Sequence, residues 1–148
     1  MRAVARHDRG YLHEVEVEGG HTVLVDEPLE AGGENSAPSP TRLVAAGLAS
    51  CIAITMRMYG LRKEWDLGET EVGVDVGYED FVPTSFTASV HFSEELSEEQ
   101  RSRLMTIARK CPVHKLLANE TPVAVTEQDE PIGPVRERPL DADGSEGA

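Results

Sequence analysis

Two cysteines, Cys51 and Cys111, are the candidates for covalent chemistry in this sequence. The chain has no nucleophile elbow, phosphate-binding P-loop, dinucleotide fingerprint or HExxH zinc motif. Two cysteines are too few for a disulfide framework or a four-cysteine zinc site. The histidines have no metal-ligand spacing, which favours structural or surface roles for His7, His13, His21, His91 and His114. The remaining chemistry is that of a thiol attacking an oxidant or an electrophile.

The local settings of the two cysteines differ. Cys51 lies within an apolar stretch, where a cysteine often serves as a small core residue. Cys111 precedes Pro112, so its sulfur is expected beside a helix N-terminus, whose unpaired N–H groups stabilise a thiolate. Positive charge is added nearby by Lys110, His114 and Lys115. Local chemistry alone therefore predicts that Cys111 is the more reactive thiol.

The longest apolar stretch, residues 43–61, predicts the helix that carries Cys51. Ser39 is a suitable N-cap and Pro40 fits the first helical position, so we expect a helix from Pro40 to about Lys63. Its predicted inward stripe is Leu43, Gly47, Cys51, Ile54, Met58 and Leu61, with Val44, Leu48, Ile52 and Tyr59 on an adjacent face. The stretch is only marginally long enough for a membrane span. A buried helix covered on several sides is the better interpretation.

Shorter segments predict strands and two further helices around this helix. Alternating patterns predict strands at residues 2–7, 11–18, 21–26, 69–79, 84–92 and 121–126, with a turn over 7–10 and a loop over 27–40. Ser97 and Gln100 form a capping box that opens a helix to about Lys110, and Pro112 allows a short helix over 113–118. This order predicts an α+β domain with antiparallel sheet over residues 1–127, followed by a solvated acidic tail, 128–148.

The charge balance excludes several classes of partner. The chain has 14 Lys and Arg against 27 Asp and Glu, a formal net charge of −13 at pH 7. Such a surface repels nucleic-acid phosphates and anionic lipid headgroups, so neither nucleic acid nor a membrane surface is an expected partner. The first 20 residues lack the apolar core of a signal peptide, so we expect a cytoplasmic protein in a reducing compartment. We expect no metal ion and no bound cofactor.

Three segments resemble the OsmC/Ohr family of osmotically inducible and organic-hydroperoxide-resistance proteins. The run SPTRLVAAGLASCIAITMRMYG is similar to the family's central cysteine helix, and CPVHKLL is similar to its second cysteine motif. GGHTVLVDEP and the order of the elements between the two motifs also match. The resemblance spans about residues 1–127, and two cysteine motifs in the right order make it specific.

The resemblance implies an OsmC-like α+β fold, in which antiparallel sheets wrap a long cysteine-bearing helix in an intertwined homodimer. It also implies thiol-dependent reduction of organic, lipid-type hydroperoxides in oxidative-stress defence. On the family pattern Cys51 is the peroxidatic thiol, which becomes a sulfenic acid, and Cys111 resolves it to an intrachain disulfide. An external dithiol then reduces the disulfide. This assignment reverses the one that local chemistry favours.

The resemblance also implies a cation for the thiolate, supplied by an arginine in the N-terminal hairpin. Arg9 is the matching residue and Arg6 the reserve. The family places a glutamate just after the proline that opens the cysteine helix, where it orients that arginine. This chain has Thr41 and Arg42 there, and a substitute carboxylate could come from Glu34 or Glu30 in the preceding loop.

Two other functions remain open at the level of sequence. One is a thiol enzyme of the same fold that acts on another oxidant or electrophile. The other is a non-catalytic OsmC-like dimer that binds a small apolar ligand between its subunits and keeps its cysteines as packing residues. Loss of both thiols on peroxide challenge, with formation of an internal disulfide, distinguishes an enzyme from a binder.

Overall fold

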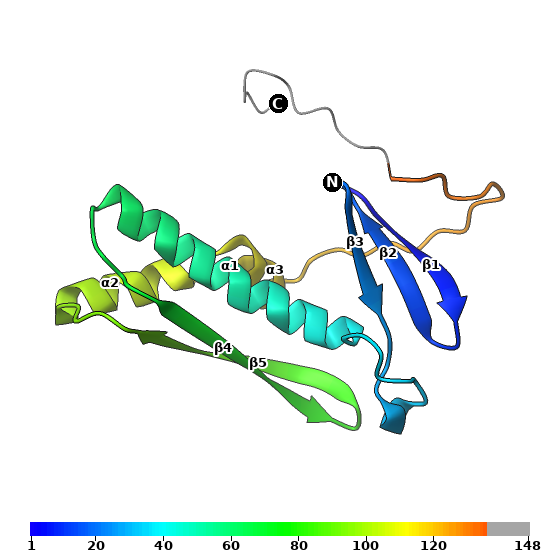
Figure 1. The fold of residues 1–148 in the computed structure, drawn as a ribbon, viewed down its shortest axis with the longest axis horizontal. Helices are drawn as coiled ribbons and strands as arrows, with labels where there is room; N and C mark the ends of the chain where they lie inside the picture. Colours follow the sequence, from blue (N-terminus) through cyan, green and yellow to red (C-terminus); the bar gives the residue numbers. More distant parts are fainter. Residues whose placement is uncertain (136–148) are drawn as a thin grey trace, which may run out of the picture. The chain divides into compact units, whose positions relative to one another are not determined.

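The computed structural model describes residues 1–135, which form two compact units (Figure 1). Unit 1 comprises Met1–Pro40 and the described part of the segment from Val125 onward. Unit 2 comprises Thr41–Ala124 and contains both cysteines. The fold is mixed α+β with two antiparallel sheets and a central helix, as the sequence predicts.

Unit 1 contains an antiparallel sheet of three strands, β1 (Ala3–Arg9), β2 (Leu12–Val17) and β3 (His21–Val25), in that order. The loop after β3 includes a short 3-10 helix, η1 (Leu29–Ala31). The predicted turn over residues 7–10 is placed too early, because β1 continues to Arg9 and the chain turns at Gly10 and Tyr11. Gly10 has φ +52°, which glycine adopts without steric cost, so the turn begins there.

A β-bulge interrupts β1 just before this turn. His7 pairs with His13 and Arg9 with Leu12, so β1 has one more residue than β2 between these pairs. The extra residue is Asp8, whose carboxylate lies 3.1 Å from the Arg9 guanidinium. Arg9 is therefore the last residue of a strand and not a residue of the turn.

Unit 2 packs two further helices and a hairpin against the central helix α1 (Pro40–Arg62). The hairpin is β4 (Thr70–Glu79) with β5 (Val82–Phe92), paired antiparallel from Thr70–Phe92 to Glu79–Val82. It is followed by α2 (Glu98–Ala108) and α3 (Pro112–Ala118) (Figure 1). The buried cluster that joins them is Leu48, Ile52, Met56, Tyr59, Leu67, Phe92, Leu104, Ile107, Ala108 and Cys111.

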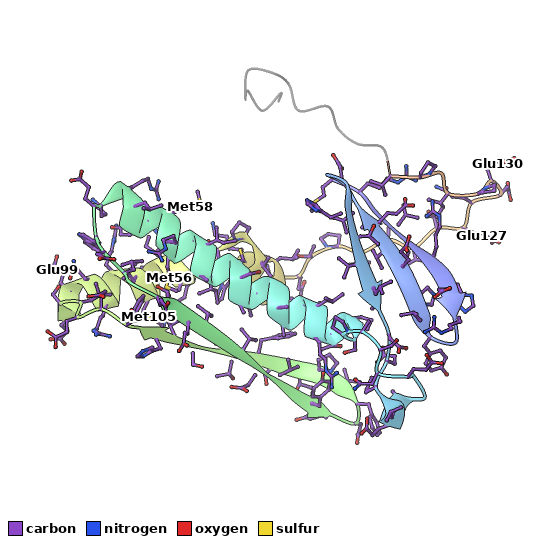
Figure 2. All side chains as sticks on the ribbon, in the orientation of Figure 1. Met56, Met58, Glu99, Met105, Glu127 and Glu130 are labelled. Atoms are coloured by element: carbon purple, nitrogen blue, oxygen red, sulfur yellow. The ribbon has the colours of Figure 1, made fainter. Side chains whose placement is uncertain are left out.

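The predicted inward stripe of α1 is wrong for the single chain. The buried face consists of Leu48, Ile52, Met56, Tyr59 and Gly60, whereas Ile54, Met58 and Leu61 are exposed by 58%, 59% and 68%. Figure 2 shows Met56 and Met58 on opposite sides of the helix. Because α1 is apolar on both faces, its sequence does not say which face the chain itself covers. By length and composition α1 is also able to cross a membrane, a weak indication that core helices share.

The helix starts of unit 2 agree with the sequence prediction. Ser97 caps α2 by accepting from the Gln100 N–H, and the Gln100 side chain accepts in return from the Ser97 N–H. Pro112 occupies the first turn of α3, and Cys111 is its N-cap. The order of residues in these caps is enough to fix the starts of both helices.

The predicted strand over residues 121–126 is wrong. The structure assigns no strand there, and Val123 and Val125 are exposed by 85% and 93%. An extended segment becomes a strand only when it pairs with another strand, and none pairs with it in the described part of the chain. Of the predicted acidic tail, residues 128–135 contain no helix or strand, and residues 136–148 lie outside the described residues.

Candidate active site

The structure brings Cys51 and Cys111 together inside unit 2. Cys51 is partly buried in the middle of α1, and Cys111 is fully buried at the N-terminus of α3. Both are free thiols, and Cys51 packs against the buried cluster that contains Cys111, close enough to influence the pKa of the Cys111 thiol. Sixty positions separate them in the chain, so the packing of α1 against α2 and α3 creates the pair.

The environment of Cys111 favours its protonated form. Burial raises the pKa of the Cys111 thiol, and the contacts with Cys51 raise it further. The backbone N–H of His114 donates to the Cys111 sulfur over 3.2 Å and opposes these effects. The expected thiolate stabilisation at the helix N-terminus is therefore present but outweighed. The local prediction of a readily ionised Cys111 is wrong because it did not include burial.

A small, mostly apolar cavity of about 210 Å³ lies among the elements that carry the two cysteines, although neither cysteine lines it. Its lining comes from α1, β5, α2 and α3: Leu48, Ile52, Phe86, Ala88, Val90, Met105, Ala108, Arg109 and His114. Ile52 is the residue after Cys51, and His114 is the residue whose N–H contacts the Cys111 sulfur. The cavity is thus mostly apolar, has the two basic residues Arg109 and His114 in its wall, and includes near neighbours in sequence of both cysteines.

The predicted cation Arg9 lies in unit 1, where two carboxylates hold it. Its guanidinium is 3.1 Å from Asp8 and 3.5 Å from Glu34. Glu34 is one of the two loop residues expected to replace the family's glutamate, and the first turn of α1 contains no acidic residue. The structure therefore places Arg9 beside Glu34 in unit 1, and it places Cys51 near Cys111 in unit 2.

The reserve candidate Arg6 is held by other groups of unit 1. Its guanidinium donates to the carbonyl of Ile132 over 3.3 Å and lies 3.8 Å from Glu16. One of its terminal nitrogens, Nη1, is buried without a hydrogen-bond partner among the described residues. Through its bond to Ile132, Arg6 connects β1 with the segment after Val125.

A buried carboxylate, Asp26, organises the loop that carries Glu34, and sequence analysis missed it. Asp26 accepts from the backbone N–H groups of Glu27, Glu34 and Ser36 and from the Ser36 hydroxyl, over 2.8–3.1 Å. These bonds, led by that from the Ser36 N–H, lower the pKa of Asp26 in spite of its burial. The available signal was an acidic residue that ends an apolar strand just before a Gly-, Asn- and Ser-rich loop.

The same loop requires a glycine at position 33. A β-carbon at Gly33 would collide with the carbonyl of Glu27 and lie 2.9 Å from the Asp26 carboxylate.

Among the described residues, no group of three or more His, Cys, Asp or Glu side chains is placed to hold a metal ion.

Comparisons with known proteins point to one family. A family model described as "OsmC-like protein" matches residues 33–126, which is more than half of the chain and includes both cysteines. No curated protein matches the sequence.

Several solved structures share the fold. An OsmC-like protein of Mycoplasma pneumoniae superposes with a TM-score of 0.68 at 14% identity, covering 79% of this chain and 86% of that one. The organic hydroperoxide resistance protein OhrB of Bacillus subtilis gives 0.56 at 22% identity, covering 78% and 87%. An organic hydroperoxide resistance protein of Legionella pneumophila gives 0.59 at 24% identity, covering 79% and 89%.

Proposed function

The chain belongs to the OsmC-like family, and from that membership we propose that it reduces organic hydroperoxides with Cys51 and Cys111. The observation that carries the proposal is that the two thiols, sixty positions apart in the chain, come together in the core of one unit. Several relatives of the same fold are named for resistance to organic hydroperoxides, which suggests the substrate class. The mostly apolar cavity among the elements that carry the cysteines suits the organic part of such a substrate.

In the proposed reaction the Cys51 thiolate attacks the outer peroxide oxygen. The O–O bond breaks, the alkoxide takes up a proton and leaves as an alcohol, and Cys51 becomes a sulfenic acid. The Cys111 sulfur then attacks the Cys51 sulfur, a disulfide forms and water leaves. An external dithiol of the reducing cytoplasm returns both thiols and is itself oxidised to a disulfide. No bound cofactor takes part in these steps.

Burial and proton affinity support this division of roles. Cys111 is fully buried and its pKa is raised, so near neutral pH it retains its proton and waits for an adjacent sulfur. Cys51 is the less buried of the two, so a peroxide has better access to it. When Cys111 attacks the sulfenic acid it gives up its proton, which leaves with the sulfenic hydroxyl group as water, so Cys111 need not be ionised in the resting protein.

We propose Arg9 as the cation for the Cys51 thiolate, held by Glu34, and a homodimer as the assembly that completes the site. The Arg9–Glu34 ion pair supports the first part, because it supplies the carboxylate that Thr41 and Arg42 do not. The exposed apolar residues of α1, Ile54, Met58 and Leu61, support the second, because a partner subunit would remove them from water. Sedimentation should show a dimer at micromolar concentration. A stable folded monomer would contradict this assembly.

The test is thiol consumption by an organic hydroperoxide in the two cysteine variants. Cys51→Ser should abolish peroxide consumption, and Cys111→Ser should complete one turnover and stop at a sulfenic or over-oxidised Cys51, visible by mass spectrometry. The wild-type protein should lose both thiols and form an intrachain disulfide. Persistence of both thiols would instead favour a non-catalytic dimer that binds an apolar ligand. Turnover in Cys51→Ser but not in Cys111→Ser would reverse the assigned roles.

A further inference from the structure

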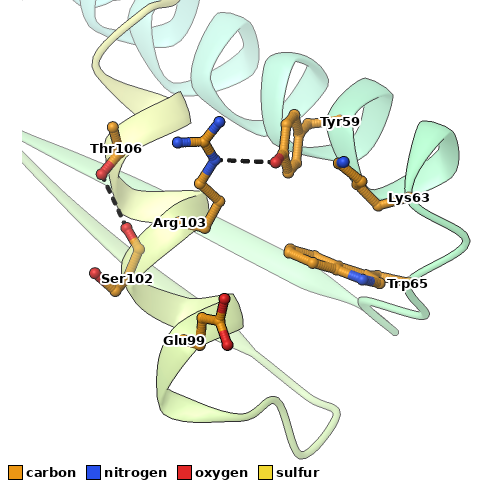
Figure 3. A pocket seen from close by; sticks show the side chains of 7 residues that line it. All are labelled: Tyr59, Lys63, Trp65, Glu99, Ser102, Arg103 and Thr106. Atoms are coloured by element: carbon orange, nitrogen blue, oxygen red, sulfur yellow. Dashed lines mark hydrogen bonds between the residues drawn. The ribbon is translucent and has the colours of Figure 1, made fainter.

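A second hollow in unit 2, larger than the cavity described above, lies between the end of α1 and α2. Its volume is about 510 Å³, and it is lined by Tyr59, Lys63, Trp65, Glu99, Ser102, Arg103 and Thr106 (Figure 3). None of these residues takes part in the proposed thiol chemistry. The hollow is large enough for a small organic molecule.

Two aromatic rings form the apolar part of this pocket. Tyr59 and Trp65 meet edge to face, with ring centroids 5.7 Å apart. Tyr59 is buried in the core, whereas Trp65 is only partly buried and packs against it. The backbone N–H of Trp65 donates to the carbonyl of Gly60, which fixes the segment that follows α1. The pocket therefore has an ordered aromatic wall on which a planar ring can stack.

Positive charge gathers around the Tyr59 ring, in contrast to the acidic chain as a whole. Lys63 and Arg103 lie 5.9 and 5.7 Å from its centroid, and Arg62 lies at 5.9 Å. Figure 3 shows the Lys63 and Arg103 side chains on either side of Tyr59. Within the described part of the chain, no carboxylate is within ion-pair distance of Lys63 or Arg103, although Glu99 lines the same pocket.

The hydrogen-bonding capacity of the Tyr59 hydroxyl in this pocket is only partly satisfied by the protein. Arg103 donates from Nε to the Tyr59 hydroxyl over 3.0 Å, and no protein acceptor for the Tyr59 proton is present among the described residues. The hydrogen bond from Arg103, together with the charges of Arg103, Lys63 and Arg62, lowers the pKa of Tyr59 against the effect of burial. The phenol oxygen thus lies in a positive potential and has a proton to donate.

We propose that this pocket binds a small aromatic carboxylate. The ring of the ligand stacks on Trp65, and its carboxylate accepts from Lys63, Arg103 and the Tyr59 hydroxyl. The two cations and the single carboxylate of Glu99 leave one net positive charge in the lining, which matches a monoanion better than a phosphate dianion. The site requires neither cysteine, so the test of this proposal is independent of the test of the hydroperoxide reductase function.

Trp65 makes the test direct, because it is the single tryptophan of the chain and lines the pocket. We would titrate the reduced full-length protein with benzoate and follow tryptophan fluorescence, with benzyl alcohol and inorganic phosphate as parallel probes. Benzoate should give a saturable change, and the two other probes should bind at least about tenfold more weakly, since one charge-assisted contact is worth that much. No saturable change, or equal binding of either other probe, would overturn the proposal.

Three variants locate the binding. Lys63→Gln and Arg103→Gln should each weaken benzoate binding about tenfold or more. Lys63 is exposed, so its replacement does not disturb the core. Arg101→Gln is the matched control on the same helix, because Arg101 bonds the carbonyl of Leu96 outside the pocket. Equal weakening by the Arg101 variant, or none by the other two, would show that the pocket is not the binding site.

Discussion

Two buried ionisable groups, Asp26 in unit 1 and Cys111 in unit 2, have pKa values that their surroundings shift in opposite directions. Asp26 is 1% exposed and Cys111 is 0% exposed, yet the pKa of Asp26 is lowered and that of Cys111 is raised. Asp26 accepts four hydrogen bonds, whereas Cys111 has the backbone N–H groups of His114 and Val113 and lies near a second thiol. The hydrogen-bond donors around each group, and not the depth of burial alone, decide the direction in which its pKa shifts.

This difference matches the tasks of the two groups. The Asp26 carboxylate accepts from the backbone of the loop that places Glu34 beside Arg9, and its lowered pKa favours the charged form that these bonds require. The protonated Cys111 has only to remain beside Cys51 until a sulfenic acid forms there. Asp26 therefore has a structural role, whereas Cys111 has a chemical role that begins only when Cys51 is oxidised.

The largest expected effect comes from removing the charge of Asp26. Asp26→Asn puts an amide N–H₂ among four donors and leaves some of them without an acceptor, so we expect Tm to fall by about 5 °C or more. Thermal unfolding followed by circular dichroism measures this change. Asp75→Asn, at an exposed position of β4, is the control and should change Tm little. Equal effects of the two substitutions would show that the Asp26 bonds do not stabilise the loop.

The second effect is the pH dependence of the stabilisation by Asp26. A carboxyl group whose pKa is lowered by folding stabilises the protein above its unfolded pKa of about 3.9, and the stabilisation is lost as pH falls further. The stability difference between the parent protein and Asp26→Asn should therefore be constant above about pH 5 and shrink below about pH 4. Urea unfolding at a series of pH values measures it. A difference that does not shrink in acid would remove the ionised Asp26 from the explanation.

The third effect concerns the thiol that retains its proton. Contacts with Cys51 raise the pKa of Cys111 in addition to burial, so Cys51→Ala should move the pH profile of Cys111 alkylation to lower pH. Because burial is the larger cause, the midpoint should still lie above the value of about 8.5 for a free thiol. An unchanged profile would mean that the two thiols do not interact.

The smallest effect is expected for the ion pair at the end of β1. The Arg9 and Glu34 side chains are 60% and 59% exposed, so Glu34→Gln should change the free energy of unfolding by at most about 1 kcal/mol. Its effect should appear instead in hydroperoxide turnover, if Glu34 orients Arg9 for the Cys51 thiolate. Glu30→Gln is the matched control in the same loop. Equal turnover in both variants and the parent would remove Glu34 from the proposed site.

The features that the sequence predicted correctly are those that depend on residues close together in the chain. The capping box of Ser97 with Gln100 and the helix start at Pro112 depend on a few consecutive positions. The inward face of α1 was wrong because that helix is apolar on both sides, and only the packing of α2 and the hairpin selects one of them. The strand at 121–126 was wrong because pairing needs a second segment that local patterning does not identify.

The same distinction holds for the site. Both cysteines were identified from their motifs, but the raised pKa of Cys111 follows from burial among residues distant in sequence. Glu34 was one of two candidate partners for Arg9, and the geometry of the loop selects it over Glu30. The Asp26 cluster was missed because its donors lie up to ten positions away, where no short motif connects them.

The bulge in β1 gives the N-terminal hairpin one residue that its pairing does not need. Asp8 is the additional residue between the His7–His13 and Arg9–Leu12 pairs. Deleting Asp8 would leave both pairs in place as direct neighbours, and buried Val4 would stay on the same face of the strand. Inserting one residue between Val4 and His7 would instead shift the start of β1 by one position, which exchanges the two faces of a strand and turns Val4 toward water. We therefore expect this hairpin to accept the deletion of Asp8 but to be destabilised by such an insertion.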